Sequence, residues 1–192
     1  MTYVKASVRR PAGNPGNGIQ PKDQLVIYDV DDILSFPQRN DAGVVIEDDI
    51  VMKAGRYAIG IYLTPGTAEI SSNSDGETDA EGYTPSVKFN HPGNEQEIRE
   101  FKTNWLSKKC IVVLRYCSGK PADLIGTPCN PCKLSVSYTG SNESNTNELT
   151  FTQISKGDDI AIYRGTDTLE EPVAVVEAGA TDIGYQTDGQ YQ

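Results

Sequence analysis

Residues 56–63 read Arg56-Tyr57-Ala58-Ile59-Gly60-Ile61-Tyr62-Leu63, and this stretch decides the fold class. Large apolar side chains stand at every second position from Tyr57 to Leu63, and the small residues Ala58 and Gly60 fall between them. Successive side chains of a β-strand point to opposite faces of the sheet, so this alternation predicts a strand with one buried face.

The same two-residue period recurs along the chain. From Leu134 to Tyr138, apolar residues alternate with serines. Residues 149–154 and 160–163 predict two more strands, joined at the turn Lys156-Gly157-Asp158. We expect further strands at residues 24–30, 43–53, 84–90, 110–117 and 173–177. The chain is therefore predicted to be mainly β.

One helix is expected near residues 94–108. Asn94 has the side chain of an N-cap, and Glu97 follows at the spacing of a capping box. The helix should pack one apolar stripe on a sheet. That stripe consists of Ile98, Phe101 and Trp105.

The length and composition favour one globular domain with polar extensions. The chain has 192 residues, 37% of them hydrophobic, and a mean hydropathy of -0.45. Gly and Pro in residues 1–22 predict an extended N-terminal arm, and residues 179–192 are a second arm or tail. Residues 23–178 then form the β-rich domain. Within it, residues 71–82 carry no large apolar side chain and are expected to be a solvated loop.

The charge argues against nucleic-acid binding. The formal net charge is -10 and the pI is near 4.5, whereas proteins that bind DNA tightly neutralise its phosphates with Lys and Arg. No apolar run approaches the length of a membrane-spanning helix, and the N-terminus lacks the apolar core of a signal peptide. We therefore expect a soluble protein that is made in the cytoplasm.

Two groups of residues have the composition of metal sites. The acidic runs 29–32 and 75–79 do not match a twelve-residue calcium loop, so a solvated acidic surface is the simpler interpretation. Cys129 and Cys132 have the spacing of half a zinc knuckle, or of a redox pair. Because Cys110 and Cys117 would point to opposite faces of one strand, the alternative is that these cysteines are buried or reduced thiols. No cofactor is expected.

Catalytic signatures are missing from the sequence. His91 is the single histidine, and it lies between Asn90 and Pro92. No nucleophile elbow, phosphate-binding loop, dinucleotide fingerprint or HExxH motif occurs. We therefore do not expect an enzyme.

The order of several segments resembles tail tube proteins of phages and prophages in Bacteroides-type bacteria. The resemblance covers roughly residues 24–165. The segments that carry it are 35–44, 53–66, 89–93 ahead of the helix, 126–131 and 157–163.

The resemblance implies a β-sandwich or half-barrel of antiparallel strands flanked by one helix. Six copies would form a ring whose inner strands close a β-barrel, and rings would stack into the tube of the virion tail. The partners would be further copies of the chain, other tail proteins, and double-stranded DNA passing through without tight binding. Both arms would cross to neighbouring subunits or to the next ring.

The resemblance also implies a role for the acidity. Between Asp23 and Asp49 stand eight acidic residues and one basic residue, Arg39. A channel lined with carboxylates would offer DNA phosphates no cation to bind. The channel-lining candidates are Asp29, Asp31, Asp32, Glu47, Asp48 and Asp49. The alternative is that these side chains coat an outer surface.

Two further functions compete with the tail tube. A tail terminator, head-tail connector or capsid decoration protein would share the acidic, β-rich character but would not polymerise into a tube. A secreted or surface-bound β-sandwich could instead bind sugar or metal through residues 71–82.

Overall fold

The computed structural model describes residues 5–169, and these form a mainly-β fold with one α-helix, as the sequence predicted. The elements are β1 (Pro21–Asp29), the 3-10 turn η1 (Val30–Asp32), β2 (Ile33–Ser35), β3 (Val45–Ile46), β4 (Val51–Met52), β5 (Ile59–Tyr62), β6 (Glu69–Asp75), β7 (Gly82–Pro92), α1 (Gln96–Trp105), β8 (Cys110–Tyr116), β9 (Ala122–Ile125), β10 (Cys132–Gly140), β11 (Asn145–Gln153) and β12 (Ala161–Tyr163).

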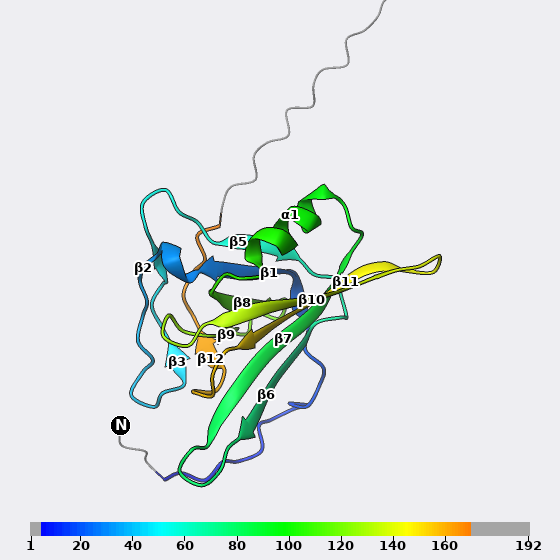
Figure 1. Cartoon of the computed structure of the whole chain (residues 1–192). Coiled ribbons are helices and arrows are strands. Elements are labelled where there is room, and N and C mark those ends of the chain that lie inside the picture. The colour runs from blue at the N-terminus through cyan, green and yellow to red at the C-terminus, as the bar shows by residue number, and fades with distance from the viewer. Residues whose placement is uncertain (1–4, 170–192) are drawn as a thin grey trace, which may run out of the picture.

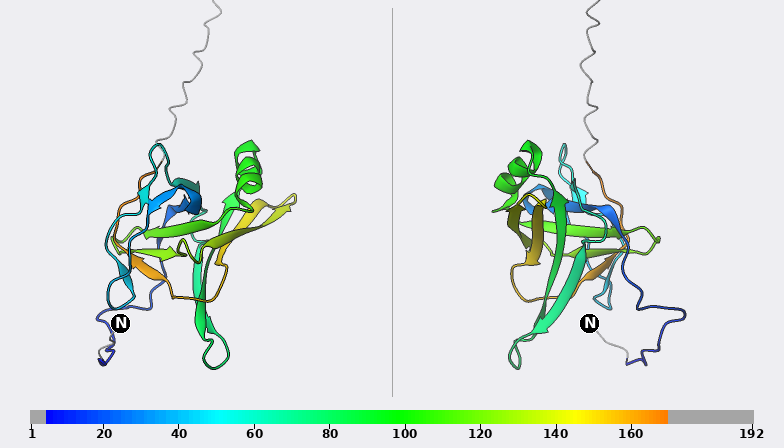
Figure 2. Two further views of the ribbon diagram at one scale, coloured as in Figure 1. Left: turned by 60° about the vertical axis from the view of Figure 1, so that its left-hand side comes forward. Right: turned by 90° about the vertical axis from the view of Figure 1, so that its right-hand side faces the viewer.

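Within residues 5–169, ten strands form two layers (Figure 1), and β2 pairs with β4 in a separate two-stranded sheet. The first layer has the strand order β5-β1-β8-β9-β12-β3. The second layer has the order β6-β7-β11-β10, and all of its neighbours are antiparallel. The layers are joined where Cys132 of β10 pairs with Cys110 of β8. Figure 2 shows the β6–β7 and β10–β11 hairpins of the second layer projecting from the body in different directions.

The main core lies between the two layers. Leu25 and Val112 of the first layer meet Phe89, Leu149 and Phe151 of the second, and all five are buried. The rings of Phe89 and Phe151 stack with their centroids 6.3 Å apart. This shared apolar filling holds the layers together.

A second core covers the opposite face of the first layer. Val26, Tyr28 and Val113 point into it, and Ile46 and Ile50 close it from the segment that follows β2. The first layer is therefore buried on both faces, which explains why β1 and β8 carry nearly continuous apolar runs instead of alternating ones.

A buried polar cluster fixes the last described segment onto this second core. Arg115 of β8 forms an ion pair with Asp167 and donates from Nη2 to the Gly165 carbonyl at 2.7 Å. The Tyr28 hydroxyl donates to Asp167 Oδ1 at 2.6 Å. Burial, together with the Asp167 charge, raises the pKa of Tyr28 far above its usual range, so this hydroxyl remains a donor.

The helix spans Gln96–Trp105, a shorter range than 94–108, and the expected capping box is wrong. Glu95 is the N-cap, with no side-chain cap hydrogen bond. Asn94 is used elsewhere, since its Oδ1 accepts from Lys102 Nζ at 2.9 Å. The same ammonium donates to Asn147 Oδ1 at 2.6 Å, which ties the helix to β11. In the expected apolar stripe, Ile98 is buried, and Phe101 and Trp105 pack against the main core.

Several local predictions need correction. Residues 71–75 are not loop but part of β6, because backbone hydrogen bonds to β7 form without large apolar side chains. The strand expected at 43–53 is reduced to β3 and β4, separated by residues 47–50, which form no strand. The strands β11 and β12 follow one another in sequence but belong to different layers. The strand expected at 173–177 and the arm at 179–192 lie outside the described residues.

Candidate assembly surface

The second layer has two open edges. Among residues 5–169, β6 pairs with β7 alone, and β10 pairs with β11 alone after its contact at Cys132. An open strand edge presents unpaired N–H and C=O groups, which can pair with a strand from another chain.

The outward backbone groups of β6 can be assigned from its neighbour. Tyr83 of β7 exchanges two backbone hydrogen bonds with Gly157, at 2.9 and 3.0 Å, so its N–H and C=O point away from β6. Tyr83 lies opposite Ser74. Because antiparallel pairs alternate in their bonding, Ser74, Ser72 and Ile70 direct their N–H and C=O groups to the open side.

The open side of β10 follows by the same reasoning. Ile154 donates from its N–H to the Pro131 carbonyl at 3.0 Å, which makes this a bonded pair between the two strands. The bonded pairs then recur at every second residue along the ladder. The residues that direct their backbone groups outward are Leu134, Val136 and Tyr138.

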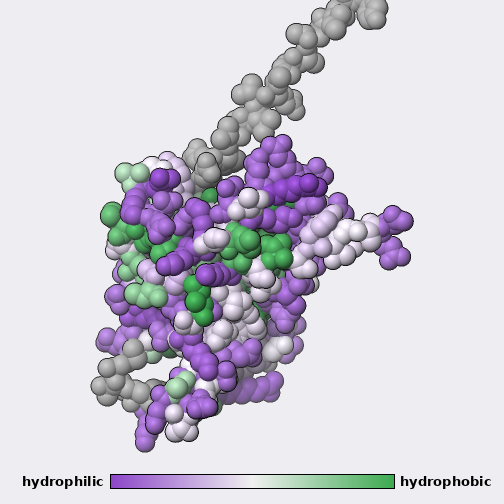
Figure 3. Space-filling model, viewed as in Figure 1, coloured by the Kyte–Doolittle hydropathy of each residue, from purple (hydrophilic) through white to green (hydrophobic). Residues whose placement is uncertain are grey.

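One face of the second layer is uncovered and polar, and we call it the hydroxyl face. Its residues follow from the strand registers, since they alternate with the buried residues of the same strands. They are Glu69, Ser71, Asn73 and Asp75 of β6, Thr84, Ser86, Lys88 and Asn90 of β7, Thr146, Glu148, Thr150 and Thr152 of β11, and Lys133, Ser135, Ser137 and Thr139 of β10. None of them is buried. In Figure 3 the projecting β10–β11 hairpin is accordingly pale, with a purple tip.

The charges on the hydroxyl face nearly cancel. Glu69, Asp75 and Glu148 stand against Lys88 and Lys133. Lys88 Nζ lies 3.3 Å from Glu69 Oε2 on the neighbouring strand. Most of the remaining side chains carry hydroxyls, and the Ser71 and Ser86 hydroxyls hydrogen-bond to one another at 2.9 Å.

Five of the six acidic candidates lie on the other side of the molecule, around the second core. Asp29 is the exception, because it follows Leu25 and Ile27 on the main-core side of β1, where it is buried and forms an ion pair with Lys108. Asp32 Oδ1 lies 3.3 Å from Arg56 Nε, and Glu47 accepts from Arg164 Nη1 at 2.9 Å.

The remaining acidic candidates are exposed. Asp49 Oδ1 accepts from the Thr166 N–H at 2.7 Å, and this bond lowers the pKa of its carboxyl. Asp31 and Asp48 are exposed as well. These side chains therefore belong to a surface separated from the hydroxyl face by both layers.

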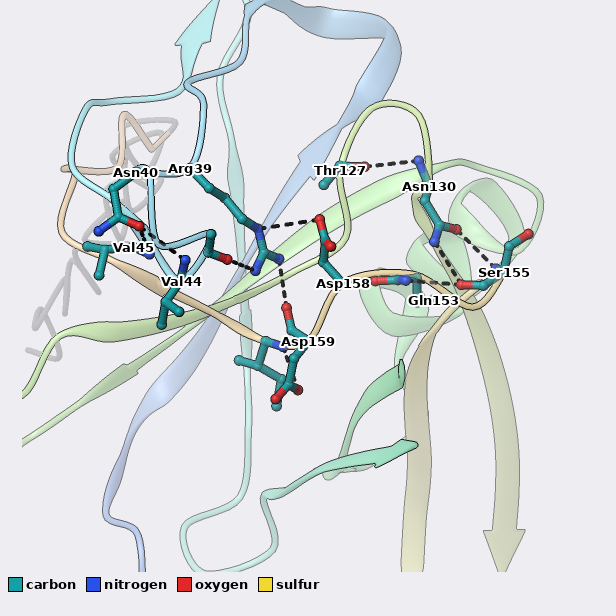
Figure 4. Close-up of polar contacts among 12 residues, drawn as sticks. Arg39, Asn40, Val44, Val45, Thr127, Asn130, Gln153, Ser155, Asp158 and Asp159 are labelled. Carbon is teal, nitrogen blue, oxygen red and sulfur yellow. Dashed lines mark hydrogen bonds and ion pairs between the residues drawn. The ribbon is translucent and has the colours of Figure 1, made fainter. Parts of the chain in front are cut away.

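Arg39 is the one basic residue between Asp23 and Asp49, and its guanidinium joins two segments of the chain (Figure 4). Its Nη1 donates to the Gly43 carbonyl at 3.0 Å and its Nη2 to the Asp159 carbonyl at 2.7 Å. Asp158 Oδ2 lies 3.9 Å from Arg39 Nε. The guanidinium thus holds the segment before β3 against the segment before β12, and its contacts are structural.

The four cysteines are not gathered at one site. Cys129 and Cys117 are exposed, whereas Cys132 is buried opposite Cys110. Within residues 5–169 no three His, Cys, Asp or Glu side chains are grouped closely enough to hold a metal ion. Burial raises the pKa of the Cys110 thiol to about 12 and also raises that of Cys132, so both stay protonated at neutral pH.

A thiol titration tests this arrangement. We expect Ellman's reagent to modify Cys117 and Cys129 in the folded protein and to reach Cys110 and Cys132 only after denaturant is added. The ratio of absorbance before and after unfolding gives the number of accessible thiols. Equal rates for all four cysteines would contradict the burial of the β8–β10 pair.

Within the described part of the chain, no helix has the length and apolarity needed to cross a bilayer. Comparisons with protein-family models, with curated proteins and with solved structures found no match to this chain.

Proposed function

We propose that this protein is a tail tube subunit of a phage or prophage, and that copies join edge to edge through the second layer. The observation that carries the proposal is the open edge at each side of that layer, on β6 and on β10. The resemblance to tail tube proteins supports the same reading from the order of the sequence segments.

The strand directions suit a ring. The second layer contains an even number of strands that alternate in direction, so its two outer strands, β6 and β10, run opposite ways. When β10 of one copy meets β6 of the next by rotation, the new pair is therefore antiparallel. A head-to-tail contact of this kind closes into a ring, and a closed sheet has no edge left to aggregate.

The side chains at the two edges are complementary. Glu69 and Asp75 stand at the two ends of β6, and Lys133 stands near the start of β10. In the register of the layer, Lys133 lies on the row that runs through Thr152 and Ser86 to Ser71, between the levels of those two acids. A staggered joint brings Lys133 of one copy toward these carboxylates of the next, which are paired within their own chain with Lys88 and Lys156 at 3.3 and 3.2 Å.

Rings of six copies would stack into a tube in the virion tail, as the resemblance implies. The segment before β1 offers a means of stacking, because residues 5–20 are exposed and form no strand. Such a segment gains order by lying across a neighbouring subunit.

A pair of proline substitutions tests the edge contact. Ser72→Pro removes an N–H that points to the open side, whereas Asn73→Pro removes an N–H that bonds to β7. We expect Ser72→Pro to retain the thermal unfolding curve of the parent protein but to lose ring and tube formation. Asn73→Pro should lower the unfolding temperature instead.

Sedimentation velocity and negative-stain electron microscopy give the readouts. Tubes or stacked rings of the parent protein support a tube subunit, whereas rings that never stack favour a tail terminator. A parent protein that stays monomeric at high concentration, or a Ser72→Pro variant that assembles normally, contradicts the proposed edge contact.

A further inference from the structure

We infer that the hydroxyl face of the second layer lines the bore of the ring, so that DNA passes along serine, threonine and asparagine side chains and not along the acidic segment. This inference rests on the proposed function and specifies which surface of the subunit meets the DNA.

Only one of the two faces of the second layer packs against other elements. One face packs on the first layer and the helix through Val87, Phe89, Leu149 and Phe151. The hydroxyl face carries no other element within the described residues. When the second layers of several copies close into one barrel, the bulky first layers cannot all fit inside it. They lie outside, and the uncovered face turns inward.

The acidic segment then lies far from the bore. Ile46 and Ile50, which flank Glu47 and Asp49, pack into the second core. That core covers the side of the first layer that faces away from the second layer. Two layers of sheet therefore separate these carboxylates from the bore.

The chemistry of the hydroxyl face suits a polyanion that must slide without binding. Affinity for DNA comes from cations that replace the counterions of the phosphates. Lys88 is paired with Glu69 at 3.3 Å, and Lys133 is the second lysine of this face. Hydroxyls exchange hydrogen bonds readily with water, and a face that carries many of them is hydrated and has little net charge.

Size-selective thiol labelling of assembled protein tests the inference. The starting chain carries Cys117→Ser and Cys129→Ser, which removes the exposed thiols. Thr150→Cys and Ser135→Cys then place a thiol on the hydroxyl face, and Asp48→Cys places one in the acidic segment. Each variant is treated as tubes and as dissociated subunits, with N-ethylmaleimide and with a maleimide-PEG too bulky to enter a bore that just admits a duplex.

In tubes of Thr150→Cys and Ser135→Cys, we expect N-ethylmaleimide to modify the new thiol and the PEG reagent to leave it unmodified. Once the tubes are dissociated, the PEG reagent should modify it as well. Asp48→Cys should react with both reagents in both states.

Tubes in which the PEG reagent reaches Thr150→Cys and Ser135→Cys, or fails to reach Asp48→Cys, overturn the inference and leave the proposed function standing. Failure of both hydroxyl-face variants to assemble would place this face at a contact between copies and would also overturn it. If the starting chain with both serines forms neither rings nor tubes, the proposed function itself fails.

Discussion

Replacing Arg115 with alanine is expected to lower the free energy of unfolding by about 3–5 kcal/mol. The Asp167 side chain is only 6% exposed, and it accepts hydrogen bonds from Arg115 and from Tyr28. Without Arg115 its carboxylate would remain buried with no compensating charge, and the Gly165 carbonyl would lose its donor. Urea unfolding followed by tyrosine fluorescence measures the loss.

Arg164 provides the matched control, because it is an arginine of the same region that forms an exposed ion pair. The side chains of Arg164 and Glu47 are 54% and 53% exposed. Such a pair contributes about 0–1 kcal/mol, so Arg164→Ala should leave the urea midpoint nearly unchanged. Similar losses for the two variants would show that burial does not set the value of the Arg115 pair. An Arg115→Met/Asp167→Leu variant should be less destabilised than Arg115→Ala, since it leaves no charge unpaired.

Phe151→Ala is expected to cost about 3–5 kcal/mol, because it opens a cavity between the two layers. Phe151 is fully buried, lies in the main core and stacks on Phe89. The surrounding strands are tied to their neighbours by backbone hydrogen bonds, so they cannot collapse into the space. Chemical denaturation with a two-state fit gives the change.

Thr150→Ala is the control for this change, since Thr150 is the preceding residue of β11 and points to the hydroxyl face. A substitution there should stay within about 0.5 kcal/mol of the parent protein. The contrast tests the face assignment of β11 directly. If Thr150→Ala proved as costly as Phe151→Ala, the register given for the second layer would be wrong.

The strands were the most predictable part of this protein. In residues 57–63 and 134–138, alternation of large apolar side chains with small or polar ones predicts one buried face, and the structure places Ile61, Leu63 and Leu134 in the main core. At the outer positions the prediction was wrong, since Tyr57 and Tyr138 are exposed and Ala58 is buried in the second core. The helix was also predictable from its apolar stripe. Its start was not, because Asn94 bonds to Lys102, and sequence spacing does not show this tertiary partner.

Strands without an apolar period were missed. The β6 sequence reads as a polar loop, yet seven residues pair with β7, from Glu69↔Lys88 to Asp75↔Gly82. A hydroxyl-rich strand at the edge of a sheet needs only its backbone partner, so its side chains carry little signal. The regular alternation of Ser and Thr in β10 and β11 was visible in the sequence and could have suggested a continuous polar face.

The sequence by itself determined that the chain would be mainly β with one packed helix, because side-chain period reflects which face of each element leaves water. Only the tertiary structure decided which strands share a layer. Pairing depends on backbone groups that are the same in nearly every residue, so local sequence does not encode the partner. The open edges of β6 and β10, the uncovered hydroxyl face, and the distance of the acidic segment from that face all follow from this pairing.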